Sequence, residues 1–335
     1  MTPVLVTGGA GYVGSHTCLR LSEAGYQPIV YDNLSNGHAE FVKWGPLEVG
    51  DIRDRARLDA VLARHRPEAV LHFAALIEVS ESVKHPDRFE DNNVAGTRQL
   101  LEAARAAGVT RFVFSSTCAT YGAPLRLPLT EDHPQQPLNP YGETKLAVER
   151  MLAQLERTAG MQAIILRYFN AAGADPERGI GEAHDPETHA IPLAIGAARG
   201  ERGAFAIFGD DYDTRDGTAL RDYVHVLDLA DAHVLALRRL QDGGGGGAYN
   251  LGSGVGTTVK ELVDMVRAVS GRPFPVITAP RRAGDSPALV ADPAKAREHL
   301  SWRARHDLRS IVESAWRWHD RDHHPGRTAG AIVAG

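Results

Sequence analysis

A tyrosine and a lysine four residues apart form a pair that could do acid-base chemistry. Tyr141 and Lys145 follow Asn139 and Pro140, which are typical of the cap and the first position of a helix. Residues four apart share one face of a helix, so the phenol and the ammonium should point to the same place. A phenol has an ordinary pKa of about 10, but a nearby lysine and an oxidised nicotinamide would both favour the phenolate. Such a phenolate can take a hydroxyl proton while a hydride leaves the same carbon.

A hydroxyl group should lie beside this pair. Thr117 ends the run Ser115–Thr117, which continues a strand-like apolar segment beginning at Phe112. An exposed helical pair next to an interior serine cluster is the alternative interpretation. A dinucleotide fingerprint upstream of these residues favours the chemical one.

The fingerprint is a glycine-rich turn after the first predicted strand. The segment Thr7-Gly-Gly-Ala-Gly-Tyr-Val-Gly14 has the spacing that lets backbone N–H groups approach a pyrophosphate at a helix N-terminus. A second strand should end at Asp32, 18 residues after Gly14, where a carboxylate can accept both hydroxyls of an adenosine ribose. The carboxylate would repel a 2′-phosphate and no arginine adjoins it. We therefore expect NAD rather than NADP.

A sheet must position these groups. Short apolar runs alternate with helical patterns in the first half of the chain, and the runs are Val4–Thr7, Ile29–Tyr31, Ala69–Phe73, Phe112–Ser115 and Ile164–Arg167. The alternation predicts an α/β fold with a Rossmann-type doubly wound parallel sheet and a smaller C-terminal α/β substrate domain. Ligands should bind at the carboxyl ends of the strands.

The predicted division of the chain is a NAD-binding Rossmann domain over 1–170 and a second domain over 171–325, for which the family resemblance described below implies UDP-sugar binding. The segment 222–250 can pack back on the first domain, and 326–335 should be a loose tail. A polar stretch, 173–190, is expected to mark the boundary and to act as a binding loop.

The composition limits the classes of partner. With 43% hydrophobic residues, 24% charged residues and a net charge of -5, the chain is ordinary for a globular protein and has no basic block for nucleic acid. The two cysteines are too few for a disulfide framework, and no signal segment or membrane-length apolar run is present. We expect a cytoplasmic protein with no nucleic-acid or membrane partner. The histidine-rich run 319–324 is interpreted as a solvated helix end, and no metal site is predicted.

These residues resemble the extended short-chain dehydrogenase/reductase superfamily and, from about Val4 to about Trp318, the UDP-glucose 4-epimerase family. The most specific segments are Asp32–Leu34, Gly50–Arg53, His72–Ala75, Asp91–Val94, Leu166–Asn170, Arg221–His225, and Ala279–Arg282 with Gly284–Asp285. The resemblance implies interconversion of UDP-glucose and UDP-galactose, in galactose metabolism, through a 4-keto sugar. It also implies tightly bound NAD that is not released during turnover, and a homodimer joined by helices near 93–107 and 141–155.

The resemblance also implies roles for individual residues. Tyr141 would be the base, Lys145 would tune it and hold the nicotinamide ribose, and Thr117 would hydrogen-bond the reacting sugar oxygen. The implied cofactor site comprises Gly8, Gly11, Tyr12, Val13, Gly14, Asp32, Asn33, Asp51, Ile52, Phe73, Ala74, Ala75, Asn92, Tyr141, Lys145 and Phe169. The implied substrate site comprises Thr117, Tyr141, Asn170, His189, Ala206, Ile207, Phe208, Arg221, Arg282, Asp285 and Leu289. Physical chemistry agrees on the two arginines, because two guanidinium groups can clamp a diphosphate by forked hydrogen bonds.

Four residues depart from the family pattern. Thr117 replaces a common serine, Ile77 a lysine near the cofactor, His189 an asparagine that touches substrate, and Leu289 a tyrosine tied to acceptance of N-acetylated hexoses. The sugar is therefore left open, and the alternatives are 4-epimerases of UDP-N-acetylglucosamine, UDP-xylose or UDP-arabinose, and UDP-glucuronate.

Two other functions are disfavoured. A nucleotide-sugar 4,6-dehydratase needs an Asp-Glu pair after the threonine, whereas Cys118 and Ala119 follow Thr117 here. A non-catalytic NAD-sensing module would not need the tyrosine and the lysine, and both are present.

Overall fold

The computed structural model describes residues 1–282 and 286–320 of the 335. Asp285, a predicted substrate contact, lies outside these residues, as do the end of the predicted second domain (321–325) and the predicted tail (326–335).

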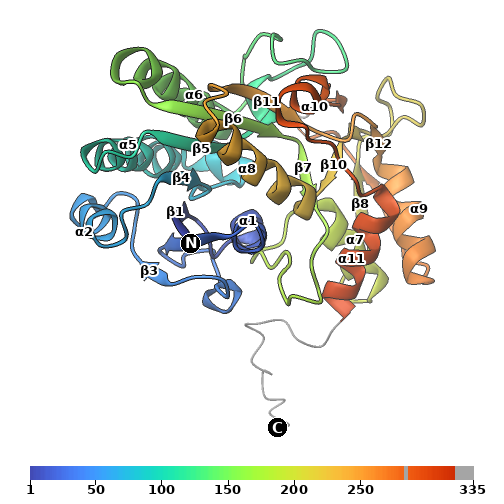
Figure 1. The fold of residues 1–335 in the computed structure, drawn as a ribbon. Helices are drawn as coiled ribbons and strands as arrows, with labels where there is room; N and C mark the ends of the chain where they lie inside the picture. The colour runs from blue at the N-terminus through green and yellow to red at the C-terminus, as the bar shows by residue number, and fades with distance from the viewer. Residues whose placement is uncertain (283–285, 321–335) are drawn as a thin grey trace.

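A seven-stranded parallel sheet lies at the centre of the larger half of the molecule (Figure 1). The strands are, in spatial order, β11 (Gly247–Leu251), β6 (Gln162–Tyr168), β5 (Arg111–Thr117), β4 (Ala69–His72), β1 (Thr2–Thr7), β2 (Tyr26–Asp32) and β3 (Leu47–Val49). The chain begins at β1, runs outward through β2 and β3, and then returns to the other side of β1. This reversal creates a switch point between β1 and β4, where a ligand crevice opens at the strand ends. All five predicted strands lie in this sheet, so the predicted Rossmann-type fold is confirmed.

Helices cover both faces of the sheet because its strands are apolar on both sides. Val4 and Val6 pack in one core with side chains of α1 (Tyr12–Glu23) and α8 (Val226–Gln241). Leu5, between them, packs in the opposite core. That second core is completed by α2 (Arg55–His65), α5 (Thr97–Ala106) and α6 (Pro140–Ala159). The alternation of successive side chains along a strand produces these two layers.

The smaller half is built from short strands around three helices. The strand pairs are β7 (Asn170–Ala172) with β10 (Tyr223–His225), β8 (Phe205–Phe208) with β13 (Val276–Ala279), and β9 (Leu220–Arg221) with β12 (Thr257–Thr258) and β14 (Ala288–Leu289). The helices α7 (Ala190–Ala198), α9 (Val259–Ser270) and α11 (Leu308–Asp320) share one apolar core with β7, β8, β10 and β13. Smaller elements are η1 (Ala39–Phe41), α3 (Val79–Lys84), α4 (Pro86–Phe89), η2 (Glu90–Gly96), η3 (Cys118–Thr120) and α10 (Ala294–Leu300).

The chain passes back to the first sheet after entering the smaller half. β11 pairs with β6 in parallel, and α8 packs on α1. The two halves are therefore joined by more than one crossing of the chain. The predicted domain limits themselves stay predictions.

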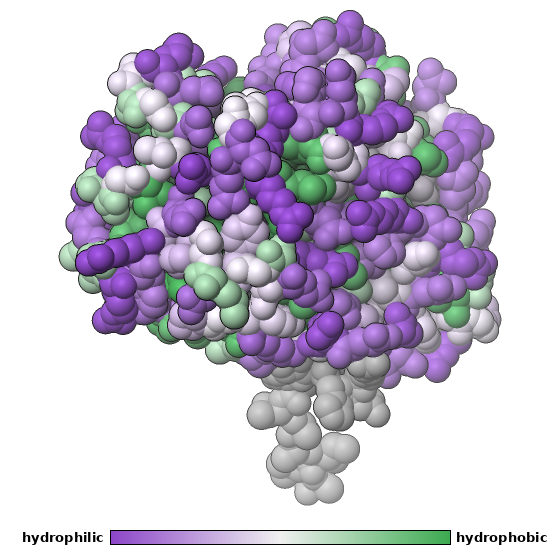
Figure 2. All heavy atoms as spheres, viewed as in Figure 1, coloured by the Kyte–Doolittle hydropathy of each residue, from purple (hydrophilic) through white to green (hydrophobic). Residues whose placement is uncertain are grey.

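The surface carries mostly polar side chains. Figure 2 shows hydrophilic residues over most of one face, with apolar residues in small groups between them. Among the residues that the structure describes, no helix has both the length and the apolar character needed to cross a bilayer.

Candidate active site

The turn between β1 and α1 requires glycine for space. Gly8 has a φ of +74°, and a Cβ there would lie 2.5 Å from the backbone nitrogen of Ala74. A Cβ on Gly14 would lie 2.2 Å from the carbonyl oxygen of Gly8. The tight turn brings the N-terminus of α1 to the end of β1, with Gly11 as its cap. Backbone N–H groups and the helix dipole at this point favour an anion such as a pyrophosphate.

Asp32 lines the crevice at the carboxyl end of β2. It is the last residue of β2 and is only 7% exposed. Its Oδ2 accepts from the backbone of Ala10 (3.0 Å) and its Oδ1 from that of Leu34 (2.9 Å). Burial raises the pKa of this carboxyl, and the two hydrogen bonds oppose the rise. Each carboxylate oxygen has a further lone pair, so the fixed carboxylate can also accept two ribose hydroxyls.

A crevice of about 370 Å³ runs from this turn to Tyr141 and Thr117. This volume lies within the range of small-molecule sites. The predicted cofactor residues that line it are Gly8, Gly11, Tyr12, Val13, Gly14, Asp32, Asn33, Ile52, Phe73, Ala74, Ala75, Asn92, Tyr141 and Phe169.

Asp51 and Lys145 are not in the lining. Asp51 forms an ion pair with Arg53 (2.8 Å) and accepts a hydrogen bond from Asn33 (3.0 Å), so it acts on the crevice through Asn33. Lys145 is buried beneath the crevice floor.

The start of α6 places Tyr141 beside the end of β5. Asn139 caps the helix by accepting from the backbone of Gly142 (2.9 Å), as its sequence predicts. A Cβ on Gly142 would lie 2.6 Å from the carbonyl oxygen of Ala119, so only glycine allows α6 to approach η3 this closely. Thr117 is at the end of β5, and both Thr117 and Tyr141 line the crevice. The phenol and the hydroxyl are therefore brought together, as predicted.

The ionisation of the pair differs from the expectation. Burial raises the pKa of Tyr141, and a hydrogen bond with Thr117 only opposes this. Burial also lowers the pKa of Lys145 to about 7, against the opposing charge of Glu149. Lys145 donates from Nζ to the carbonyl oxygen of Ser115 (2.9 Å) and lies 5.9 Å from the centroid of the Tyr141 ring. Burial therefore opposes the phenolate, and the positive charge of an oxidised nicotinamide would favour it.

A buried ion pair holds this part of the site together, and the sequence analysis missed it. Arg167 on β6 and Glu149 on α6 are 2.6 Å apart, with side chains 6% and 4% exposed. Ser116 on β5 donates a hydrogen bond to the same carboxylate (2.5 Å). Glu149 follows Lys145 by four residues and so lies on the same helix face, but this spacing does not indicate Arg167 as its partner. The pair fixes α6 against the two strands next to the crevice.

A second pocket, of about 400 Å³, adjoins the crevice in the smaller half. Asn170, His189 and Arg221 line both spaces. The second pocket is also lined by Ala206, Phe208 and Arg282. The predicted sugar-nucleotide residues that the structure describes therefore meet here, with two exceptions that follow.

Ile207 and Leu289 lie elsewhere. Ile207 is predicted to bind substrate, but its side chain packs in the core because alternate residues of β8 face opposite sides. Leu289 lines the first crevice, with the other departures from the family pattern, Thr117, Ile77 and His189. All four departures are thus crevice residues, which is where a change of sugar preference would arise.

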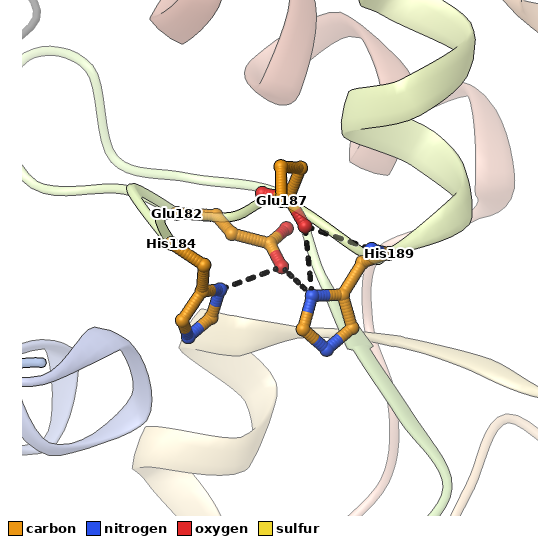
Figure 3. A group of neighbouring side chains, drawn as sticks. All are labelled: Glu182, His184, Glu187 and His189. Carbon is orange, nitrogen blue, oxygen red and sulfur yellow. Dashed lines mark hydrogen bonds and ion pairs between the residues drawn. The ribbon is translucent and has the colours of Figure 1, made fainter. Parts of the chain in front are cut away.

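The polar loop before α7 carries a cluster of two glutamates and two histidines, Glu182, His184, Glu187 and His189 (Figure 3). Only His189 is identified from the sequence. Burial alone would lower the pKa of His189, but the charges of Glu182 and Glu187 raise it to about 10. The missed signal is a Glu-x-His-x-x-Glu-x-His spacing inside the predicted binding loop.

Comparison with known proteins gives consistent relatives over nearly the whole chain. The model of the NAD dependent epimerase/dehydratase family matches residues 4–252. A UDP-glucose 4-epimerase of Rhizobium meliloti (strain 1021) is 63% identical over 323 residues, which are 96% of this chain and 98% of that protein.

Solved structures agree with these relatives. A UDP-glucose 4-epimerase from Brucella ovis in complex with NAD is 50% identical, with a TM-score of 0.92 over 94% of this chain and 98% of that chain. The UDP-Glc/GlcNAc 4-epimerase from Campylobacter jejuni is 39% identical, with a TM-score of 0.84 over 95% of this chain and 99% of that chain.

Proposed function

Because the chain belongs to the NAD dependent epimerase/dehydratase family, we propose that it is an isomerase that interconverts UDP-glucose and UDP-galactose by inverting C4 of the hexose. The observation that carries the proposal is the junction of the two spaces at Asn170, His189 and Arg221. The cofactor crevice holds Tyr141 and Thr117, and the adjoining pocket holds the arginines. A sugar linked to a diphosphate can therefore reach the base while its nucleotide remains anchored.

NAD fits the first space. The glycine turn leaves room only for backbone beside the helix N-terminus, and Asp32 stands where the adenosine ribose would lie. In this proposal, the cofactor residues implied by the family resemblance bind NAD tightly. Bound NAD supplies the acceptor that takes the C4 hydride and returns it to the other face of the sugar.

The residues of the chain supply the proton chemistry. Tyr141 removes the C4 hydroxyl proton, and Thr117 hydrogen-bonds the same oxygen. A 4-keto sugar results, turns in the pocket, and receives the proton back from Tyr141 after rotation. Lys145 lies beside the base, and its ammonium, which uses one donor on Ser115, has donors left for the nicotinamide ribose.

The nucleotide must stay in place while the hexose turns. Arg221 and Arg282 bind the diphosphate by charge-assisted hydrogen bonds, and Asn170 and His189 contact it from the loop side. Ala206, Phe208 and the backbone of Ile207 form the uridine site, and Leu289 borders the hexose. Strong contacts on the nucleotide and few on the sugar permit rotation without release.

Acceptance of UDP-N-acetylhexosamines is a second candidate activity. Leu289 stands where some members of the family have tyrosine, and it lines the crevice. A branched aliphatic side chain there leaves room beside the hexose. The Campylobacter jejuni relative, named a UDP-Glc/GlcNAc 4-epimerase, supports this possibility.

We further propose that the protein acts in the cytoplasm as a homodimer, in galactose metabolism. The two cysteines are buried and unpaired, which suits a reducing compartment. The helices named by the family resemblance, near 93–107 and 141–155, would form the interface between protomers.

The experiment is a substrate panel with the full chain and no added NAD. UDP-galactose should yield UDP-glucose, and UDP-N-acetylglucosamine, UDP-xylose and UDP-glucuronate are run in parallel. Turnover of UDP-xylose or UDP-glucuronate but not of UDP-hexoses would replace the proposed substrate. No turnover of UDP-hexoses by NAD-loaded protein would overturn the proposal.

A further inference from the structure

The cluster in the loop before α7 has features of a cation site. The four ligand atoms, one from each of Glu182, His184, Glu187 and His189, all lie within 4.8 Å of one another. Figure 3 shows Nδ1 of both imidazole rings directed at the Glu182 carboxyl group, with the Glu187 carboxyl group beside His189. Glu182 is the innermost member, with a side chain only 5% exposed.

One hydrogen bond donor lies between several acceptors. Nδ1 of His189 is 2.7 Å from Glu182 and 2.9 Å from Glu187, and Nδ1 of His184 is 3.2 Å from the same Glu182 oxygen. Nδ1 of His189 is shared between two carboxylates, Oε1 of Glu182 is shared between two imidazoles, and the two carboxylates repel each other. A divalent cation at the centre would bind both carboxylates and neutralise their two charges.

The donor set and the spacing fit zinc. Imidazole nitrogen and carboxylate oxygen are zinc ligands, and bonds of about 2.0–2.2 Å put tetrahedral ligand atoms roughly 3.4 Å apart. Three of the separations, 2.7, 2.9 and 3.2 Å, are shorter than this value, and all of them are within 4.8 Å, so an ion would bring the ligands to this spacing through small movements. Oxygen-only cations such as magnesium are disfavoured by the two imidazoles.

The backbone around the cluster is already fixed. Trp318 of α11 donates to the carbonyl oxygen of Glu182 (2.8 Å), and His38 is 2.9 Å from that of Ala183. A Cβ on Gly181 would lie 2.4 Å from the Trp318 ring, so the loop is held close to α11. A ligand loop held in this way loses little conformational freedom when it binds an ion.

We propose that Glu182, His184, Glu187 and His189 form a closed, four-ligand zinc site that fastens the loop between β7 and α7. A site with four protein ligands and no open position is structural rather than catalytic. It lies on the wall of the crevice and sets the position of His189 at the start of α7. The sequence analysis predicted no metal site because these ligands lie on an irregular loop. The inference does not depend on the identity of the sugar.

The test is metal content in the full chain, produced without a polyhistidine tag and incubated with zinc chloride. After removal of free metal we expect about one zinc per chain, because a closed four-ligand site binds tightly. Removal of that zinc with a chelator should lower the melting temperature by about 5 °C. Cobalt(II) in place of zinc should give the intense visible absorption of four-coordinate cobalt.

Two variants separate this site from other histidines. The double variant Glu182→Gln, His184→Asn keeps the side-chain shapes and should lose the bound zinc. His65→Asn is the matched control. His65 also contacts a carboxylate, that of Glu48 (2.6 Å), but the other partners of Glu48 are arginines rather than a second histidine. It should retain the zinc.

Three results would overturn the proposal. One is wild-type protein that takes up no zinc. Another is a double variant that binds as much zinc as the wild type, together with loss of zinc when His323 and His324 are replaced by alanine. That result would assign the zinc to the histidine-rich run 319–324. The third is a visible spectrum typical of six-coordinate cobalt(II), which would contradict a four-ligand site. This measurement uses the wild-type protein, so it remains valid even if the double variant does not fold.

Discussion

Tyr141 and Lys145 stand on a helix of 20 residues that lies against the main sheet, whereas Arg221 stands on a strand of two residues in the smaller half. Lys145 and Thr117 are buried, at 4% and 7% exposed. The ion pair between Glu149 and Arg167 holds the helix that carries Lys145 against the sheet. On the other wall, Arg282 is exposed and lies over the ring of Phe208, 3.7 Å from its centroid.

The difference follows from what each wall must do. A proton transfer needs a donor and an acceptor within about 3 Å. The first wall, which carries Tyr141, Lys145 and Thr117, is accordingly rigid and closely packed. Anchoring a diphosphate needs charge and reach, which the half-buried Arg221 and the exposed Arg282 supply through long side chains. Changes on the first wall should therefore affect rate and stability, and changes on the second should mainly affect KM.

The largest effect should come from Tyr141→Phe. Loss of the phenolic proton acceptor should lower kcat for UDP-galactose by about 1,000-fold, within the range of general-base catalysis. Bound NAD, measured after denaturation, should be unchanged. Tyr26→Phe is the control, since Tyr26 hydrogen-bonds Gln241 (2.6 Å) and does not line the crevice. Activity within tenfold of wild type in Tyr141→Phe would place the base elsewhere.

Removing the support under the first wall should cost stability. Glu149→Ala leaves Arg167 buried without its carboxylate, so the free energy of unfolding should fall by about 3–5 kcal/mol. Denaturant unfolding measures it. The exposed pair Arg309–Glu313 (3.4 Å, 54% and 50% exposed) provides the control, and Glu313→Ala should cause no measurable change. Equal losses of unfolding free energy in Glu149→Ala and Glu313→Ala would contradict a special contribution of the buried pair to the rigidity of the first wall.

Low pH should weaken the side of the molecule that carries the first sheet. Burial lowers the pKa of His72 to about 3 and that of His16 to about 4; for His233, burial lowers it to about 4 against the opposing effect of a backbone hydrogen bond. The unfolded chain binds protons at these histidines near pH 6.5, whereas the folded chain does not. Their contribution to stability is complete above pH 6.5 and is lost as the pH falls toward 4. The melting temperature should drop between pH 7 and pH 5, and a constant value would contradict the buried neutral state.

The smallest effect should come from the second wall. Arg282→Ala removes one forked donor, so KM should rise by about tenfold, equivalent to about 1.4 kcal/mol, with kcat nearly unchanged. Arg281→Ala is the adjacent control, because Arg281 pairs with Asp211 (2.7 Å) and is not in the lining of the second pocket. Steady-state kinetics with UDP-galactose separate the two. A fall in kcat equal to the rise in KM would make the two walls alike.

The sequence was most informative where short segments specify their own geometry. The glycine turn, the capped start of α6 and the end of β2 each depend on neighbouring residues, and all three lie where they were predicted. The ends of parallel strands then bring Thr117 and Tyr141 together without further information.

Contacts between distant segments could not be predicted in the same way. The pair of Glu149 and Arg167 depends on the packing of α6 against β6, and the inward side chain of Ile207 depends on the register of a short strand. The effect of Lys145 and an oxidised nicotinamide on the phenol stays a prediction, and burial raises the pKa of Tyr141 against it. The roles of the site residues, and the domain limits, stay predictions.

The return of the chain to the first sheet has a consequence for synthesis on the ribosome. Ile164 of β6 pairs with Gly247 of β11, and the strand ends at Leu251. Until that strand has emerged, the nascent chain carries β6 as an open edge, and α1 lacks the cover of α8. The nucleotide half should therefore mature only after much of the second half has been translated. A fragment ending at residue 170 should aggregate rather than fold as an independent domain.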